Sequence, residues 1–252
     1  MIVSIINQKG GTGKTTTTLN LGRALTLHGY RVLLIDMDPQ ANLTYSLAIK
    51  DFEYSIKDLL SGKIEFNDAK IEADHLDIIP TTIDLAYYLS TMEDDFLLLH
   101  KELEACTDYD FILIDCPPSL SGLTLNALYA SNYVLIPMQL DVFSIMGLLQ
   151  IINTITEVRL HSPNNLEILG VLPVMVDLRK RLTEEVLAHV DREFDVNVFK
   201  CSIRTNVKAA EAPSFGQSVI DYAPDSNSAM DYKAFTNELL QLLEERKELN
   251  IN

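Results

Sequence analysis

Short apolar runs rich in β-branched residues alternate along the chain with longer segments in which apolar positions recur at helical spacing. Continuous apolar runs of this length are typical of strands that are covered on both faces, as they are in a parallel sheet. The expected strands span residues 2–7, 31–36, 76–80, 111–115, 133–137, 166–176 and 196–201. The expected helices span residues 15–28, 82–89, 94–105, 121–130, 143–160, 181–194 and 232–249.

Regular alternation of strand and helix predicts right-handed βαβ units. The expected fold is therefore α/β, with a doubly wound, mostly parallel sheet flanked by helices. No internal repeat, low-complexity stretch or linker interrupts the pattern, so we expect a single domain over residues 1–252. In such sheets, ligands bind at the carboxyl ends of the strands. Candidate chemistry is therefore expected where each predicted strand ends.

Composition limits the class of protein. Hydrophobic residues make up 47% and charged residues 22% of the chain, an ordinary balance for a globular protein with a full core. No apolar run approaches the roughly 18 residues of a membrane span, and the charged residue that opens a signal peptide is missing. The three cysteines form no paired motif, which fits a reducing compartment. These features predict a cytoplasmic protein.

The net charge of −16 bears on nucleic-acid binding, because proteins that bind DNA usually carry a basic surface. Charge acts through local patches as well as through the total. Acidic residues gather in residues 51–110 and 238–248, whereas residues 179–208 are richer in lysine and arginine. The charge therefore disfavours tight wrapping of DNA but is compatible with one basic face.

A glycine-rich segment follows the first predicted strand, where residues 8–16 read QKGGTGKTT and lead into a helix. Glycines let a loop wrap around phosphate oxygens with its N–H groups pointing inward, and the helix N-terminus adds a positive end. Lys14 can reach the β- and γ-phosphates, and the Thr15 hydroxyl can bind Mg²⁺. The segment predicts a P-loop with ATP and Mg²⁺ as cofactors. The predicted nucleotide-binding residues are Lys9, Gly10, Gly11, Thr12, Gly13, Lys14, Thr15 and Thr16.

Acidic residues close two further predicted strands. Asp36 and Asp38 alternate by two at the end of the second strand, so they share a side of the chain at its phosphate end. The apolar strand at residues 111–115 ends in Asp115, in the manner of a Walker B strand, and this carboxylate can hold Mg²⁺ directly or through water. Each aspartate could instead cap a helix or a turn.

A second lysine distinguishes this loop from the usual pattern GxxxxGK[ST], which has glycine at the position of Gln8. Lys9 precedes paired glycines, and the segment resembles that of the deviant P-loop ATPases. The resemblance implies that Lys9 crosses into a partner subunit and contacts the nucleotide there, as an arginine finger does elsewhere. It also implies that Gly10 is needed where two such loops face each other. An exposed lysine at a loop entrance is the plainer alternative.

Three motifs stand in the order and spacing of the ParA/Soj DNA-partitioning ATPases: KGGTGKTTT, DMDPQAN and LIDCPPSLSGLTLNAL. The resemblance continues through VLIPMQ, VMVDLR, EAPSFGQS and DYAP, and it covers essentially the whole chain. It implies a P-loop ATPase of the deviant Walker A, SIMIBI type, with slow turnover that a partner stimulates. It also implies that Lys9, Lys14 and Asp38 are catalytic, with Asp38 positioning or activating the attacking water. Asp36 would help to order Mg²⁺ beside Thr15 and Asp115.

The same resemblance implies an ATP-switched homodimer that binds DNA without sequence preference and would associate with the nucleoid. A ParB-like adaptor would connect it to a DNA or other cargo. By motif position, Arg179 and Lys208 match the family's basic DNA contacts. Asn206 matches the residue that contacts adenine, in a base pocket formed with Arg204 and the backbone around residues 202–207. Ordinary solvated charges and a turn residue remain the alternatives for these positions.

Other functions stay open. A membrane-recruited ATPase of the MinD kind needs a basic amphipathic C-terminal helix, whereas the polar face of residues 235–248 is mostly acidic, so no membrane partner is expected. A metal-cluster carrier of related fold needs a cysteine pair, which neither Cys116 nor Cys201 supplies. A nucleotide-switched adaptor with little turnover is disfavoured by the presence of Lys14, Asp38 and Asp115.

Overall fold

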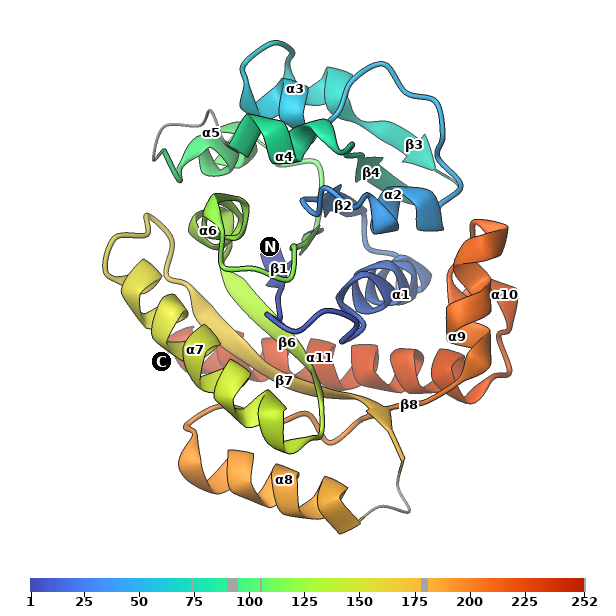
Figure 1. Cartoon of the computed structure of the whole chain (residues 1–252), viewed down its shortest axis with the longest axis vertical. Helices are drawn as coiled ribbons and strands as arrows, with labels where there is room; N and C mark the ends of the chain where they lie inside the picture. The colour runs from blue at the N-terminus through green and yellow to red at the C-terminus, as the bar shows by residue number, and fades with distance from the viewer. Residues whose placement is uncertain (74, 90–94, 105, 178–180, 252) are drawn as a thin grey trace.

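A sheet runs through the centre of the molecule (Figure 1). The computed structural model describes residues 1–73, 75–89, 95–104, 106–177 and 181–251. Within them, eight strands form one sheet in the order β3-β4-β2-β5-β1-β6-β7-β8. The strands are β1 (Ile2–Ile5), β2 (Val32–Asp36), β3 (Ile71–Ala73), β4 (Leu76–Ile79), β5 (Phe111–Asp115), β6 (Tyr133–Gln139), β7 (Glu167–Val176) and β8 (Ile203–Arg204). Every neighbouring pair is parallel except β3 with β4, which confirms the predicted doubly wound, mostly parallel sheet.

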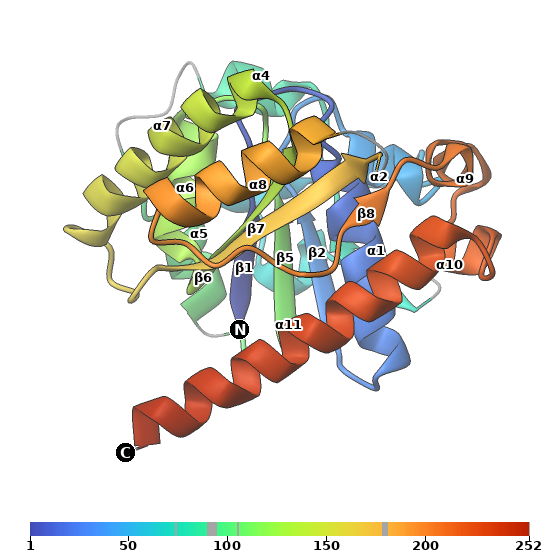
Figure 2. The same cartoon turned by 90° about the horizontal axis from the view of Figure 1, so that it is seen from below.

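Helices cover both faces of the sheet (Figure 1, Figure 2). On one face, α1 (Lys14–Leu27) packs against α11 (Asn227–Ile251). On the other face lie α5 (Leu98–Glu104), α6 (Gly122–Ala130), α7 (Val142–Arg159) and α8 (Arg181–Glu193). The shorter elements are α2 (Asn42–Ser46), α3 (Ile56–Leu60), η1 (Phe66–Ala69), α4 (Asp84–Leu89), α9 (Val207–Glu211), η2 (Ala212–Phe215) and α10 (Val219–Tyr222).

Alternation of side chains along the strands divides the buried apolar residues into two cores. In β2, Leu33 and Ile35 join the core that includes α5 to α8. Val32 and Leu34 join the core that includes α1 and α11. The strands are apolar on both faces because both faces are covered, and this is why they read as continuous apolar runs in the sequence.

Helix α1 lies close to the sheet at Gly22. A Cβ atom added at Gly22 would lie 2.8 Å from Leu34 Cδ2 and 3.3 Å from Leu76 Cδ2. A side chain at this position would therefore press on the sheet, and its absence allows the close approach. The approach fixes α1, and with it the loop that precedes α1, against the strand ends.

Helix α11 turns its apolar stripe inward. Tyr232, Phe235, Leu239 and Leu243 are buried in the core that α11 shares with α1. The rings of Phe235 and Phe199 meet edge to face, with their centroids 4.9 Å apart. Packing within the molecule therefore accounts for the stripe. Across the described ranges, no helix combines the length and the apolar character needed to cross a membrane.

The predicted strand over residues 196–201 is wrong. Only an isolated bridge forms there, at Val198, and the edge strand of the sheet is the later β8. The N–H groups of Lys200 and Cys201 donate to the carboxylate of Glu238, at 2.7 and 2.8 Å, and are not available to the sheet ladder. A side chain of α11 therefore ends the pairing, and local sequence carries no sign of that contact.

Candidate functional site

Two glycines shape the loop between β1 and α1. Gly11 has φ 73° and Gly13, the N-cap residue of α1, has φ 74°. Residues with a Cβ atom avoid this left-handed conformation, so the loop needs glycine at both positions. Asn7 fastens the loop, because its Oδ1 accepts from the N–H of Lys9 (3.0 Å) and its Nδ2 donates to the Pro137 carbonyl in β6 (2.7 Å). The protein's own hydrogen bonds therefore anchor the loop to the sheet.

The N-terminus of α1 offers unused hydrogen-bond donors. No side chain caps it, and no acidic residue lies in its first turn. The first N–H groups of a helix have no partner within the helix, and they carry the positive end of its dipole. A Cβ atom added at Gly10 or Gly11 would meet nothing within 4 Å, so the space in front of the loop is open. This arrangement suits an anion such as phosphate.

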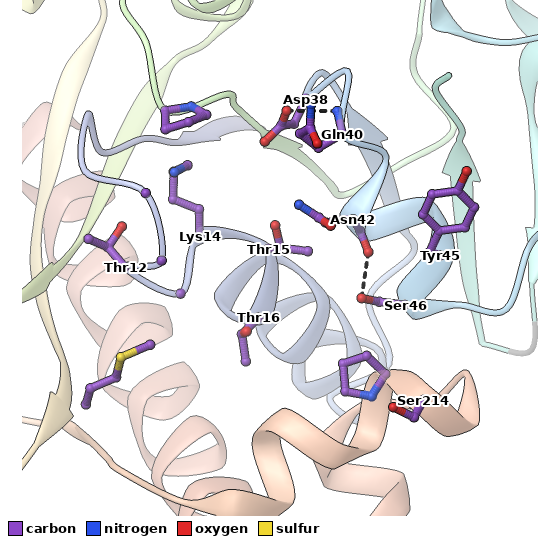
Figure 3. A pocket seen from close by; sticks show the side chains of 16 residues that line it. Thr12, Lys14, Thr15, Thr16, Asp38, Gln40, Asn42, Tyr45, Ser46 and Ser214 are labelled. Atoms are coloured by element: carbon purple, nitrogen blue, oxygen red, sulfur yellow. Dashed lines mark hydrogen bonds between the residues drawn. The ribbon is translucent and has the colours of Figure 1, made fainter. Parts of the chain in front are cut away.

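A cavity of about 600 Å³ lies in front of the loop (Figure 3), within the size range of small-molecule sites. In Figure 3, Lys14 and Thr15 lie on one side of the cavity, across from Asp38 and Gln40. Its wall is formed by Gly10, Gly11, Thr12, Gly13, Lys14, Thr15, Thr16, Asp38, Gln40, Asn42, Tyr45, Ser46, Pro118, Met175, Pro213 and Ser214. The structure thus brings the predicted P-loop residues after Lys9 together with Asp38.

Half of the residues in this wall are not among the site residues predicted from the sequence. Asn42, Tyr45 and Ser46 belong to α2, Met175 to β7, and Ser214 to η2. A signal exists, because most of them lie within or beside the motifs DMDPQAN, VMVDLR and EAPSFGQS. Met175 also has a φ of 54°, a conformation that side chains other than glycine rarely adopt and that concentrates at functional sites.

Asp36 and Asp115 stand side by side, because they are register partners at the ends of β2 and β5. Asp115 Oδ2 accepts from the Thr15 hydroxyl at 2.6 Å, whereas Asp115 Oδ1 is buried without a hydrogen-bond partner. Asp36 Oδ1 accepts from the Asp38 N–H at 3.2 Å. Asp36 Oδ2 accepts from both the N–H and the hydroxyl of Thr44, at 2.9 and 2.8 Å. Asp36 is therefore occupied by the protein, while Asp115 has an oxygen to offer.

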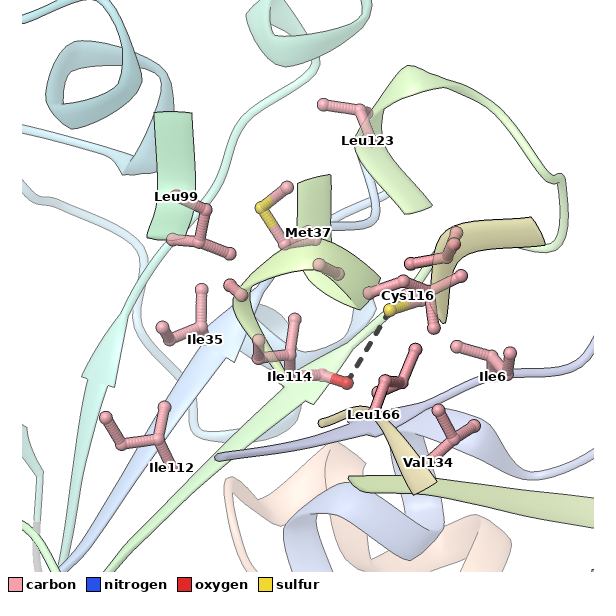
Figure 4. Close-up of a cluster of buried hydrophobic side chains, with 14 of the residues drawn as sticks. Ile6, Ile35, Met37, Leu99, Ile112, Ile114, Cys116, Leu123, Val134 and Leu166 are labelled. Atoms are coloured by element: carbon pink, nitrogen blue, oxygen red, sulfur yellow. Dashed lines mark hydrogen bonds between the residues drawn. The ribbon is translucent and has the colours of Figure 1, made fainter. Parts of the chain in front are cut away.

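Apolar surroundings control the ionisation of this pair. The neighbours in the chain, Met37 and Cys116, belong to a fully buried cluster (Figure 4). Burial raises the pKa of Asp36 to about 7. Burial, reinforced by the adjacent charge of Asp36, raises the pKa of Asp115 well above its usual value, although the Lys14 ammonium opposes the rise. Two carboxylates in such surroundings are unfavourable unless a cation compensates their charge.

The lone oxygen of Asp115 fits a magnesium ion. Mg²⁺ prefers oxygen ligands and keeps several waters, so its sites need few protein side chains. In the part of the chain that the structure describes, no group of three or more His, Cys, Asp or Glu side chains could hold a metal by itself. Asp115 and Thr15 are the residues best placed to hold Mg²⁺. The contribution predicted for Asp36 stays a prediction.

Lys9 lies on the rim of the loop, outside the cavity wall. Its ammonium donates to Asp141 Oδ2 at 2.6 Å and to Gln139 Oε1 at 3.1 Å, and its side chain is 44% exposed. Asp141 also caps α7 by accepting from the Ser144 N–H. Within one chain the Lys9 ammonium is therefore directed to the start of α7 and not to the cavity. The motifs do not reveal Asp141, because its contact with Lys9 joins residues far apart in the sequence.

The residues predicted to form a base pocket lie away from the cavity wall. Arg204 forms an ion pair with Asp231, in which the nearest nitrogen and oxygen are 2.6 Å apart. Asn206 is the N-cap of α9, where its Oδ1 accepts from the Lys208 N–H at 2.8 Å. Neither residue lines the cavity. Their contact with a base stays a prediction.

Of the two predicted DNA contacts, one can be placed. Lys208 is half exposed, donates to Glu211 Oε2 at 2.9 Å and lies over the ring of Tyr222. Arg179 lies outside the described residues. A role in DNA binding stays a prediction for both.

Comparison with known proteins identifies relatives over the length of the chain. Residues 1–168 match the family model described as an AAA domain. The sporulation initiation inhibitor protein Soj of Bacillus subtilis (strain 168) is 42% identical, over 94% of this chain and 97% of that protein. The chromosome-partitioning ATPase Soj of Treponema pallidum (strain Nichols) is 40% identical, over 93% of this chain and 95% of that protein.

A solved structure matches the same fold. The cobyrinic acid a,c-diamide synthase of Mycobacterium smegmatis, with bound ADP and magnesium, superposes with a TM-score of 0.83. The match covers 96% of this chain and 95% of that one, at 32% sequence identity. A protein of the same fold, 32% identical to this chain, therefore binds ADP and Mg²⁺ in its solved structure.

Proposed function

The chain belongs to the ParA/Soj family of partitioning ATPases, and we propose that it works as an ATP-dependent homodimer that binds DNA without sequence preference. It is an ATPase that uses Mg²⁺, and in this proposal a ParB-like adaptor stimulates its slow turnover and connects it to a DNA or other cargo. One observation carries the proposal: the Lys9 ammonium lies outside the cavity wall of its own chain and is held by Asp141 at the start of α7.

The site residues divide the chemistry among them. The N–H groups of residues 10–16 and the Lys14 ammonium bind the phosphates, and Thr15 and Asp115 hold Mg²⁺. When bound, Mg²⁺ compensates negative charge on the phosphate oxygens during phosphoryl transfer. Asp38 lines the cavity, and the Gln40 N–H fixes its Oδ1 at 3.0 Å. The Asp38 carboxylate orients the attacking water by accepting a hydrogen bond from it.

A second protomer completes the site in this proposal. Lys9 lies on the exposed rim and is held by Asp141 at the start of α7. On the adjoining helix face, Phe143 is 84% and Met146 64% exposed. Large apolar side chains beside an exposed lysine suit a protein interface. On dimer formation Lys9 leaves Asp141 and reaches the partner's nucleotide, where its charge assists hydrolysis.

DNA binding depends on a small basic region of an acidic protein. The net charge of −16 repels phosphates at long range, so binding must rest on few local contacts. Arg179 and Lys208 are the proposed contacts, and two copies of each in a dimer would double the number. The ATP-bound form would then be cytoplasmic and associated with the nucleoid. The apolar stripe of α11, which is packed in the core, gives no support to membrane recruitment.

The DNA proposal is tested with two labelled duplexes of unrelated sequence, by fluorescence anisotropy in the presence of ATP at several salt concentrations. The double variant Arg179→Glu, Lys208→Glu should bind both duplexes about tenfold more weakly or worse. The slope of log affinity against log salt should fall by about 1 for each lost phosphate contact. The double variant Lys63→Glu, Lys101→Glu changes the charge equally, at exposed lysines paired with Asp58 and Asp95, and it should bind like the wild type. Wild-type protein that ignores both duplexes at low salt would contradict the proposal.

A further inference from the structure

The carboxyl group of Asp36 is fully buried, and each of its oxygens accepts a hydrogen bond from the protein. Oδ1 accepts from the N–H of Asp38, and Oδ2 accepts from both the N–H and the hydroxyl of Thr44. The carboxyl does not reach the cavity wall, although Asp38, two residues later, does. Asp36 is thus placed to hold other groups and not to touch a ligand.

The Thr44 hydroxyl extends this contact to another part of the sheet. It donates to Asp36 Oδ2 at 2.8 Å and accepts from the N–H of Thr81 at 3.1 Å, just after β4. Thr44 and Thr81 are each only 1% exposed, so water cannot replace either bond. Because a hydroxyl carries one proton and also offers lone pairs, it can serve both neighbours at once. A methyl group of the same shape would leave the Thr81 N–H without a partner and would leave Asp36 Oδ2 with the Thr44 N–H alone.

The segment between these anchors forms one wall of the cavity. It carries Asp38, Gln40 and Asn42, all of which line the cavity. Its own structure is weak, because α2 has only five residues and Ala41 has a left-handed φ of 55°. Helices of this length do not form alone, and strained residues persist only where surrounding contacts hold them. The conformation of this wall must therefore depend on its long-range hydrogen bonds.

We propose that Asp36, Thr44 and Thr81 form a hydrogen-bonded relay that positions Asp38 for ATP hydrolysis, with the Thr44 hydroxyl as its central member. Asp36 acts in this relay as a positioning residue, and its contribution passes through Thr44 and the Asp38 N–H. The relay fastens one cavity wall to the ends of two neighbouring strands, β2 and β4. The inference rests on the role proposed above for Asp38.

The relay can be tested first in the nucleotide-free protein. Thr44→Val keeps the shape of the side chain and removes the hydroxyl, whereas Thr44→Ser keeps the hydroxyl. Amide hydrogen exchange at Thr81 should accelerate about tenfold in Thr44→Val and stay within about twofold of wild type in Thr44→Ser. Thr44→Ala serves as a second variant without the hydroxyl if Thr44→Val folds poorly. If amide exchange at Thr81 were unchanged in Thr44→Val and in Thr44→Ala, the relay would not exist.

Turnover kinetics then separate positioning from mere support of the fold. In Thr44→Val, kcat should fall by about tenfold or more while the Kd for ATP changes by less than about threefold, and Thr44→Ser should restore kcat. Accelerated exchange with normal kcat would overturn the positioning role. If ATP affinity and the melting temperature fell together with kcat, the positioning role would be overturned too, because the hydroxyl would then only support the fold. Failure of the premise is distinct, since it would appear as undiminished turnover in Asp38→Ala.

Discussion

Asp36 and Asp115 occupy neighbouring strand ends, where both carboxyl groups are fully buried and the Lys14 ammonium acts on Asp115. Their pKa values are raised, first of all because burial disfavours the charged form. At the residue scale, these two carboxyl groups thus make the nucleotide-free protein less stable than it would be with an apolar or an amide side chain in place of one of them. Sites that must receive a cation commonly carry this kind of cost, because the cation then relieves it.

Asp115→Asn should raise the melting temperature of the nucleotide-free protein at pH 8, while Mg²⁺-dependent ATP hydrolysis is lost. Relief of about 1–2 kcal/mol of unfavourable charge corresponds to roughly 2–8 °C for a chain of this size. Thermal unfolding followed by circular dichroism measures the change. Asp225→Asn, which removes an exposed carboxylate, should leave the melting temperature unchanged.

The gain from Asp115→Asn should shrink as the pH falls through the raised pKa of Asp115 towards about 4, the usual pKa of a carboxyl group in an unfolded chain. Because the carboxyl pKa is raised in the folded state, the folded protein binds protons in this range that the unfolded protein does not. Wild-type stability therefore increases on acidification, and the variant lacks part of that increase. An unchanged or lower melting temperature of the variant at pH 8 would show that the carboxyl does not destabilise the site.

At the scale of elements, the sequence predicts those strands, helices and loops whose formation depends on a local pattern of residues. The buried strands β1, β2, β5 and β6 follow from their apolar runs, and the loop before α1 follows from its glycines and lysine. Strand β3 has three residues and exists because Ile71 pairs with Ile78 in β4. Helix α2 has five residues and depends on the bonds of Thr44. Elements this short carry no periodicity, so tertiary contacts decide whether they form.

The candidate site divides in the same way. Lys14, Thr15, Asp38 and Asp115 belong to motifs whose spacing predicts their meeting at the strand ends. The contact of Lys9 with Asp141, by contrast, bridges 132 positions in the sequence. No local pattern records such a distance, because the fold alone brings the two residues together. The sequence therefore predicts the residues that would contact a nucleotide better than it predicts the residues that hold those side chains in place.

Packing of α1 on the sheet gives a prediction for stability. Gly22→Val should destabilise the protein by about 1–3 kcal/mol, because the new side chain would press on Leu34 and Leu76. Chemical denaturation measures the loss. Gly147→Val is the matched control on α7, where an added Cβ meets nothing within 4 Å, and it should change the stability by less than about 1 kcal/mol. Equal effects of the two substitutions would contradict the close approach of α1.

At the scale of the whole molecule, one face collects the features that a second protomer would need. The open P-loop, the Lys9–Asp141 ion pair and the exposed Phe143 and Met146 follow one another around the end of β6 and the start of α7. The Lys9 ammonium does not serve the cavity of its own chain. The central claim is therefore that each protomer supplies Lys9 to the nucleotide of its partner.

Mixing two inactive variants tests this claim most directly. Lys9→Ala keeps its own Asp38 but cannot serve a partner, while Asp38→Ala can supply Lys9 but cannot use its own site. Each variant alone should hydrolyse ATP at a small fraction of the wild-type rate, measured as phosphate release. Half of the dimers in an equal mixture are mixed, and each has one complete site, so activity should recover to about a quarter of wild type. A mixture no more active than its components would place the work of Lys9 within its own chain and contradict the account.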